Sequence, residues 1–158
     1  MTINHHHIAA VFTSMLLVVL IASVLSSQAH ATDIKYCGDG NYPVQVNGVD
    51  IDPNPVKRGK TATFSISGTS ETEIAKGKMV IDVEYFGFNV HEKTDDLCEK
   101  TQCPILGDFV LSHSQSLPTL TPPGTYTLEM KMYGDDEKLL TCINFDFSIG
   151  FFAPVADI

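Results

Sequence analysis

Two histidines and four cysteines are the residues of this chain best suited to chemistry. His91 and His113 are the histidines that lie beyond the N-terminal region, and neither has a nucleophile and an acid arranged beside it as a catalytic triad requires. The chain also lacks the G-x-S-x-G motif that carries the nucleophile of many hydrolases. We therefore expect that the protein is not an enzyme.

Acidic runs and a histidine triplet are the candidate metal ligands. Asp95-Asp96 and Asp135-Asp136-Glu137 offer carboxylate oxygens, but both runs fall in polar stretches, so we interpret them as solvated loop charges. The histidines at positions 5–7 precede a segment that we expect to be removed from the mature chain. We predict no metal site and no cofactor.

The chain has an even number of cysteines, as secreted proteins with disulfide frameworks commonly do. They are Cys37, Cys98, Cys103 and Cys142. A zinc site would need more closely spaced ligand pairs on both sides. Of the three possible connectivities, we predict Cys98–Cys103 because the short spacing suits a local loop. The remaining pair, Cys37–Cys142, falls near opposite ends of the domain, and closing such a loop contributes about 4–5 kcal/mol in the chain-entropy model.

The N-terminal segment differs in composition from the rest of the chain. All 10 basic and all 19 acidic residues lie after Ala31. An apolar run, Ile8 to Leu25, is followed by small residues at positions 29 and 31, which is typical of a signal peptide cleaved after Ala31. An uncleaved membrane anchor is the alternative, because the run is near the lower length limit for spanning a bilayer. We predict a cleaved signal peptide at 1–31 and one domain at 32–158.

The net charge of −9 lies entirely on the expected mature domain. Such a balance argues against a nucleic-acid partner and against constitutive binding to anionic membranes. Six stretches of this domain alternate between apolar and polar residues, the period of two that strands have. They cover residues 42–51, 61–67, 78–85, 109–111, 125–132 and 139–149.

Turn residues separate these stretches, notably Pro53, Pro55 and the triplet Pro122-Pro123-Gly124. After Phe88 the residues become mostly polar, and we expect a loop from there to the Cys98–Cys103 staple. No stretch has a helical period. The pattern predicts an all-β fold, an antiparallel two-sheet β-sandwich.

The apolar faces of these strands have two interpretations, which periodicity does not separate. They form either a solid core or the wall of an internal apolar cavity, in which soft methionine side chains accommodate varied ligands. Phe86 and Phe88 extend past the end of a strand and would lie at the mouth of such a cavity. The candidate lining residues are Phe64, Ile66, Met79, Ile81, Val83, Tyr85, Phe86, Phe88, Phe109, Leu111, Leu128, Met130, Met132, Ile143, Phe145 and Phe147.

The order of several motifs resembles the ML lipid-recognition family. These are G-V-D-I-x-P-x-P-V-x-x-G at 48–59, C-x-x-x-x-C-P-I at 98–105, Leu117-Pro118, and the two outer cysteines. The branch that it resembles most contains the plant and fungal phosphatidylglycerol/phosphatidylinositol transfer proteins, which are similar to the Niemann-Pick type C sterol carrier. The resemblance covers essentially all of residues 37–150.

This resemblance implies an immunoglobulin-like sandwich that holds one sterol or phospholipid between its sheets, with both predicted disulfides as family disulfides. It implies a non-catalytic, monomeric lipid-transfer protein that contacts membranes transiently. Its location would be secreted or the endomembrane lumen, that is extracellular, vacuolar or lysosome-like. An adhesive or receptor-binding sandwich with a filled core is the alternative.

The chain departs from the animal sterol carrier at three places. It has no cysteine in 51–59, where that carrier has a further disulfide. It has Pro122-Pro123 in place of an aromatic residue, and Met132 in place of a tryptophan. Because these changes fall at the expected mouth and wall, a sterol and a phospholipid both stay open as cargo.

Overall fold

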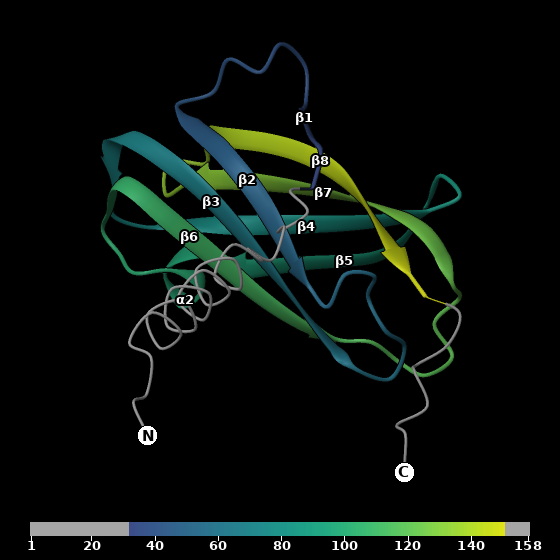
Figure 1. Ribbon diagram of the computed structural model, residues 1–158. Helices are drawn as coiled ribbons and strands as arrows, with labels where there is room; N and C mark the ends of the chain where they lie inside the picture. Colours follow the sequence, from purple (N-terminus) through teal and green to yellow (C-terminus); the bar gives the residue numbers. More distant parts are fainter. Residues whose placement is uncertain (1–31, 151–158) are drawn as a thin grey trace, which may run out of the picture.

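Two antiparallel sheets face each other in the computed structural model, which describes residues 32–150 (Figure 1). The predicted signal peptide at 1–31, with its histidines at 5–7, lies outside the described residues, as do residues 151–158. Within 32–150, no helix is long and apolar enough to cross a membrane. The elements are β1 (Ile34–Tyr36), β2 (Val44–Asp52), β3 (Thr61–Ile74), β4 (Gly77–Tyr85), β5 (Phe88–Asp96), α2 (Leu97–Lys100), β6 (Ile105–Ser116), β7 (Gly124–Gly134) and β8 (Leu139–Ile149).

The larger sheet has the strand order β1-β8-β7-β4-β5, and the smaller sheet has the order β2-β3-β6. All strand pairs within both sheets are antiparallel. In Figure 1 the strands of the smaller sheet cross those of the larger one obliquely. This arrangement confirms the predicted all-β sandwich. It also makes β5 and β6 edge strands on the same side of the molecule, joined through α2.

Alternating side chains from both sheets form the core between them. Phe64 and Ile66 of β3 are buried, as are Ile143 and Phe145 of β8. The residues between them are more exposed, so the period of two predicted from the sequence holds over most of β3 and from Ile143 onward in β8, whereas residues 140–143 are all buried. Each fully buried large side chain contributes about 1.5–3 kcal/mol relative to an exposed one, so this shared core holds the sheets together.

The stretch after Phe88 is a strand, so the prediction of a loop there was wrong. Tyr85 pairs with Phe88 across a two-residue turn, Phe86-Gly87, and both turn residues have a positive φ, 52° and 76°. Positive φ at both positions is the geometry of the tight turns that join antiparallel strands. The polar composition of β5 misled the prediction because β5 is an edge strand, and charged residues commonly protect such edges.

Two disulfides confirm the predicted pairing of the cysteines. Cys37 bonds Cys142, which ties the end of β1 to β8, and Cys98 bonds Cys103, which encloses most of α2 and the turn after it. None of the four cysteines is free. Since structural disulfides persist in oxidising environments, this pattern indicates an extracellular or lumenal location.

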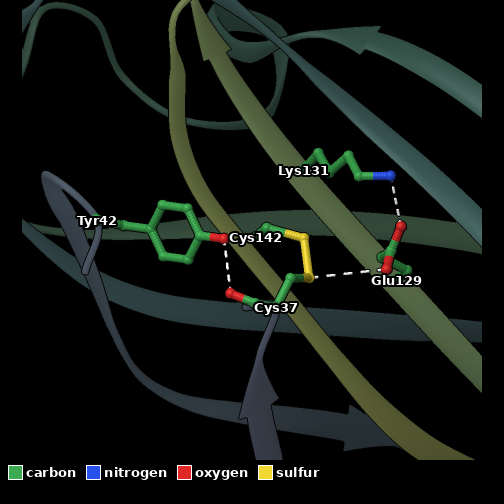
Figure 2. The surroundings of a disulfide bond; sticks show 5 residues. All are labelled: Cys37, Tyr42, Glu129, Lys131 and Cys142. Carbon is green, nitrogen blue, oxygen red and sulfur yellow. Dashed lines mark hydrogen bonds and ion pairs between the residues drawn. A yellow bond between two sulfur atoms is a disulfide. The ribbon is translucent and has the colours of Figure 1, made fainter. Parts of the chain in front are cut away.

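The surroundings of the longer-range disulfide are polar, as Figure 2 shows. The hydroxyl of Tyr42 donates a hydrogen bond of 2.7 Å to the carbonyl oxygen of Cys37. Oε2 of Glu129 lies 3.6 Å from Sγ of Cys37, and its carboxylate pairs with Lys131. Cys37, Glu129 and Cys142 thus bring potential ligand atoms together, but sulfur atoms in a disulfide offer no thiolate to a metal ion.

Candidate functional site

A cavity of about 460 Å³ lies between the sheets, at the end where β4 and β6 finish. This volume falls in the range of small-molecule sites, about 300–1,000 Å³. Most of the lining is apolar. The lining residues are Phe64, Ile81, Val83, Tyr85, Val90, His91, His113, Gln115, Ser116, Leu117, Pro118, Leu120, Thr121, Pro122, Tyr126, Leu128, Phe147 and Ile149.

The sixteen candidate residues from the sequence divide into three groups in the structure. Those that border the cavity are Phe64, Ile81, Val83, Tyr85, Leu128 and Phe147. Those that lie further along the same strands, within or against the packed core, are Ile66, Met79, Phe109, Leu111, Met130, Met132, Ile143 and Phe145. Phe86 and Phe88 are 82% and 74% exposed at the β4–β5 turn. The sandwich is therefore filled at one end and hollow at the other.

A row of five aromatic rings crosses the hollow end. The ring centroids of Phe86 and Tyr85 are 4.4 Å apart, and those of Tyr85 and Tyr126 are 4.5 Å apart. Tyr126 stacks on Phe147 with the centroids 5.5 Å apart, and Phe147 and Phe64 make a T-shaped contact at 5.3 Å. The last contact joins β8 to β3, so the row links the two sheets. Such pairs contribute about 0.5–1.5 kcal/mol each beyond simple burial, which makes this wall rigid.

Two tyrosine hydroxyls fix the β6–β7 connection against this wall. Tyr85 donates a hydrogen bond of 3.0 Å to the carbonyl of Pro123, and Tyr126 donates one of 2.7 Å to the carbonyl of Pro122. Burial raises the pKa of Tyr126, and the neighbouring Tyr85 adds to this effect, so the hydroxyl stays a donor. Leu120 in the same connection is 90% exposed, which places it at the rim.

The polar part of the lining comes largely from the two edge strands. A β-bulge interrupts the pairing of β4 with β5 after Val83, which pairs with His91, and both Val90 and His91 border the cavity. Bulges commonly re-aim side chains in this way. On β6, His113 and Gln115 follow the alternation of Leu111 and also border the cavity. We call the gap between β5 and β6 the seam.

A charged cluster bridges the seam beside the cavity. Nδ1 of His113 lies 3.2 Å from Oδ2 of Asp95, although the two atoms are not aligned as a hydrogen bond. The ammonium groups of Lys93 and Lys100 lie 3.2 Å and 3.4 Å from the same carboxylate. Asp95, interpreted from the sequence as a solvated loop charge, is instead largely buried in strand β5.

The cluster sets the charge of its two titratable members. Burial lowers the pKa of His113, and the positive charge of Lys93 lowers it further. Burial acts to raise the pKa of Asp95, but Lys93 and Lys100 outweigh burial and hold that pKa below its ordinary value. The imidazole is therefore neutral and the carboxylate charged near neutral pH.

The sequence prediction selected apolar residues and so missed the polar and loop residues of the lining. One signal was available, because His113 continues the alternation of Phe109 and Leu111. His91 could be placed only with the register of β5, and residues 117–122 have no periodic pattern. Ser116, another polar lining residue that was missed, shares a hydrogen bond of 3.0 Å between its hydroxyl and that of Thr61. The arrangement suits noncovalent binding of an apolar molecule that has a polar end.

Comparison with known proteins assigns the chain to a family. The family model described as the ML domain matches residues 31–149. A protein from Aspergillus oryzae is 33% identical over 118 residues, covering 70% of this chain and 67% of the relative. A relative from Aspergillus fumigatus is 33% identical, covering 70% of this chain and 68% of the relative. One from Emericella nidulans is 32% identical, covering 70% of each chain. All three are named phosphatidylglycerol/phosphatidylinositol transfer proteins.

Solved structures share the fold at low sequence identity. A Niemann-Pick type C2 protein from Japanese carpenter ant is 13% identical with a TM-score of 0.61, covering 75% of this chain and 99% of that one. Chicken MD-1, solved in complex with lipid IVa, is 14% identical with a TM-score of 0.51, covering 77% and 99%. With the family model matching most of the chain, these findings show that the protein belongs to the ML domain family.

Proposed function

We propose that this protein is a lipid carrier, which holds one lipid molecule in the cavity and exchanges it with membranes without covalent chemistry. The observation that carries this proposal is the hollow end of the sandwich, where a cavity of about 460 Å³ is lined mainly by apolar side chains. A filled core, as the alternative of an adhesive module requires, would leave no such space. The transfer proteins named among its relatives support a phospholipid as the cargo.

The proposed membrane contact lies at the open end of the cavity. The β2–β3, β4–β5 and β6–β7 connections lie together at one end of the sandwich, on the right in Figure 1. Phe86, Phe88, Val90 and Leu120 are exposed at this end, and Val90 and Leu120 also line the cavity. Exposed aromatic and aliphatic side chains insert into the interface of a bilayer, so a lipid would pass between membrane and cavity at this end.

The distribution of charge supports the same orientation. The segments 53–60, 86–91 and 117–123 contain three of the ten basic residues and none of the nineteen acidic residues. The three are Lys57, Arg58 and Lys60, in the β2–β3 connection. The net charge of −9 disfavours constitutive binding to anionic membranes, but the three segments themselves carry no carboxylate, although Asp52 and Glu92 flank two of them. Basic groups near an anionic surface attract it by about 1 kcal/mol each.

The carrier would act as a monomer in an extracellular, vacuolar or lysosome-like lumen, after removal of residues 1–31. The uncharged apolar segment that precedes Ala31 and the two disulfides support this route.

The test begins with the protein secreted from a eukaryotic host. Its organic extract is examined by mass spectrometry for bound lipid, and the purified protein is then assayed for transfer of pyrene-labelled phosphatidylglycerol between vesicles. We expect one lipid per chain and transfer in proportion to protein concentration. If the extract holds no lipid and transfer does not exceed the spontaneous rate, the protein is not a carrier.

A further inference from the structure

The polar groups of the cavity lining include imidazole and amide groups gathered at the seam, beside Phe64 at the end of the aromatic row. His91 comes from β5, while His113 and Gln115 come from β6. Among residues 32–150, no aspartate or glutamate borders the cavity, although acidic residues outnumber basic ones in the chain by nineteen to ten. An apolar molecule lying against the aromatic row would therefore have its polar end at the seam.

Two of these side chains have unused hydrogen-bonding capacity. Nδ1 of His113 is buried and has no aligned hydrogen-bond partner within residues 32–150. Across the same described range, no hydrogen bond or ion pair involves the side chain of His91. Buried polar groups in folded proteins nearly always have partners, so an imidazole without an aligned partner beside the cavity can hydrogen-bond a ligand there.

The electrostatic surroundings of the seam favour a negative group. Lys93 pairs with Ile81 in the register of β4 and β5, so it lies on the same face of β5 as His91. The carboxylate of Asp95 is already paired with two ammonium groups, those of Lys93 and Lys100. The three charges therefore sum to +1 even when the histidines are neutral. Asp82 and Glu92 are partners in the register of β4 and β5. Both alternate with the inward-facing residues, so their carboxylates belong to the outer face of the sheet.

We propose that His91, His113 and Gln115 form a headgroup site that takes the phosphodiester of a glycerophospholipid, in preference to the single hydroxyl of a sterol. This inference rests on the proposed function. A phosphodiester presents several acceptor oxygens and a negative charge, which matches donors from two facing strands. A sterol hydroxyl uses only one or two partners and leaves the others unsatisfied. The acyl chains then occupy the apolar space along Tyr85, Tyr126 and Phe147.

The test compares two ligands with identical pyrene-labelled acyl chains, phosphatidylglycerol and diacylglycerol, which differ in the phosphorylated headgroup. Binding to the full mature protein is measured by pyrene fluorescence. We expect the wild type to prefer phosphatidylglycerol. The variant His91→Leu keeps the approximate size of the side chain but removes its hydrogen-bonding nitrogens. It should bind phosphatidylglycerol roughly tenfold more weakly, as loss of a hydrogen bond to a charged group implies. Its binding of diacylglycerol should be unchanged, which also shows that the variant is folded.

The matched control is Asn89→Leu, in the same hairpin. The amide of Asn89 donates to Asp82 at 3.3 Å, and its side chain does not border the cavity, so both ligands should bind as to the wild type. Wild-type affinity for phosphatidylglycerol in the double variant His91→Leu/Gln115→Leu would overturn the headgroup site. Equal losses for both ligands would also overturn it, because the residues would then be only part of the wall. A wild type that binds both ligands equally well refutes the headgroup site but not the carrier, whereas one that binds neither refutes the carrier.

Discussion

Nδ1 of His113 on β6 lies 3.2 Å from Oδ2 of Asp95 on β5, so the pair bridges the edge strands of opposite sheets beside the cavity. Both groups are largely buried, and Lys93 and Lys100 complete the charge balance of Asp95. The charge state of one histidine is thus linked to the contact between the sheets at the seam.

This relationship predicts how stability depends on pH. Burial lowers the pKa of His113 in the folded protein below the reference value of 6.5. As pH falls through the range below 6.5, the unfolded chain binds a proton at this position more readily than the folded one, so the free energy of unfolding decreases. Asp95 acts in a lower range, since its depressed pKa gives stability that is lost only at acid pH below its usual value.

Urea unfolding at about pH 7.5 and about pH 5.5, on either side of the ordinary histidine pKa, measures this effect. We expect the wild type to be less stable at the lower pH and His113→Asn to show a smaller difference. His91→Gln, which keeps the His113–Asp95 pair, is the control and should keep the wild-type difference. If His113→Asn retains the full difference, the pH dependence arises at other groups.

Much of the fold could be predicted from alternation alone, because a strand with one buried face shows its period directly. β8 was predicted with its observed bounds, Leu139–Ile149, and β4 was predicted to within one residue. β5 escaped prediction because an edge strand exposes most of its side chains and needs no apolar face. The sequence of its turn, Phe86-Gly87, also lacks the Asn or Asp that commonly precedes Gly in such turns.

The cavity could be predicted only in part, because alternation identifies which residues face inward but not where the sheets separate. Val83 and Met130 both face inward, yet Val83 borders the cavity while Met130 is fully buried in the filled half. The difference depends on register and on the obliquely packed sheets, which no local pattern encodes. The polar seam depends on the pairing of β5 with β4, which was itself not predicted.

Substitution by tryptophan should distinguish the hollow half from the filled half. Val83→Trp should fill part of the cavity and abolish uptake of pyrene-labelled phosphatidylglycerol while the protein stays folded. Met130→Trp should instead overpack the core and cost about 1–3 kcal/mol of stability. Val80→Trp is the matched control, because Val80 lies on the outer face of β4, the strand that carries Val83. It should change neither lipid uptake nor stability by much. Lipid uptake and thermal unfolding give both readouts. Normal uptake by a folded Val83→Trp protein would exclude this position from the binding site.

The two disulfides should contribute differently to stability. Cys37 and Cys142 are 105 residues apart, whereas Cys98 and Cys103 are 5 apart. The chain-entropy model gives about 5 kcal/mol for the longer loop and about 2 kcal/mol for the shorter one. Replacing Cys37 and Cys142 by Ser should therefore lower the free energy of unfolding more than replacing Cys98 and Cys103. Urea unfolding of both double variants measures the difference, and equal losses would contradict this account.

The shorter disulfide should affect lipid exchange more than stability. It constrains α2, and Lys100 of α2 pairs with Asp95 at the seam. Loosening this loop should weaken the seam and speed the loss of bound lipid, measured as the dissociation rate of pyrene-labelled phosphatidylglycerol. The Cys37 and Cys142 double variant is the comparison, since that disulfide joins β1 to β8, away from the seam.

The orientation of the carrier at a membrane gives the last prediction. Lys57 and Lys60 lie in the β2–β3 connection, which is held beside the rim because the amide of Leu117 donates to the carbonyl of Lys60 at 3.0 Å. Replacing both lysines by Gln should weaken binding to vesicles that contain phosphatidylglycerol by roughly thirtyfold, from about 1 kcal/mol per lysine. Binding to vesicles of phosphatidylcholine alone should change little, and added salt should reduce the difference.

A second double variant, Lys76→Gln with Lys138→Gln, removes the same charge from the connections β3–β4 and β7–β8 at the opposite end of the sandwich. It should bind phosphatidylglycerol vesicles almost as the wild type does, because those lysines would face away from the membrane. Flotation of each protein with vesicles measures the four combinations of variant and lipid. Equal weakening by both double variants would show that net charge alone controls binding, and the proposed orientation would then be wrong.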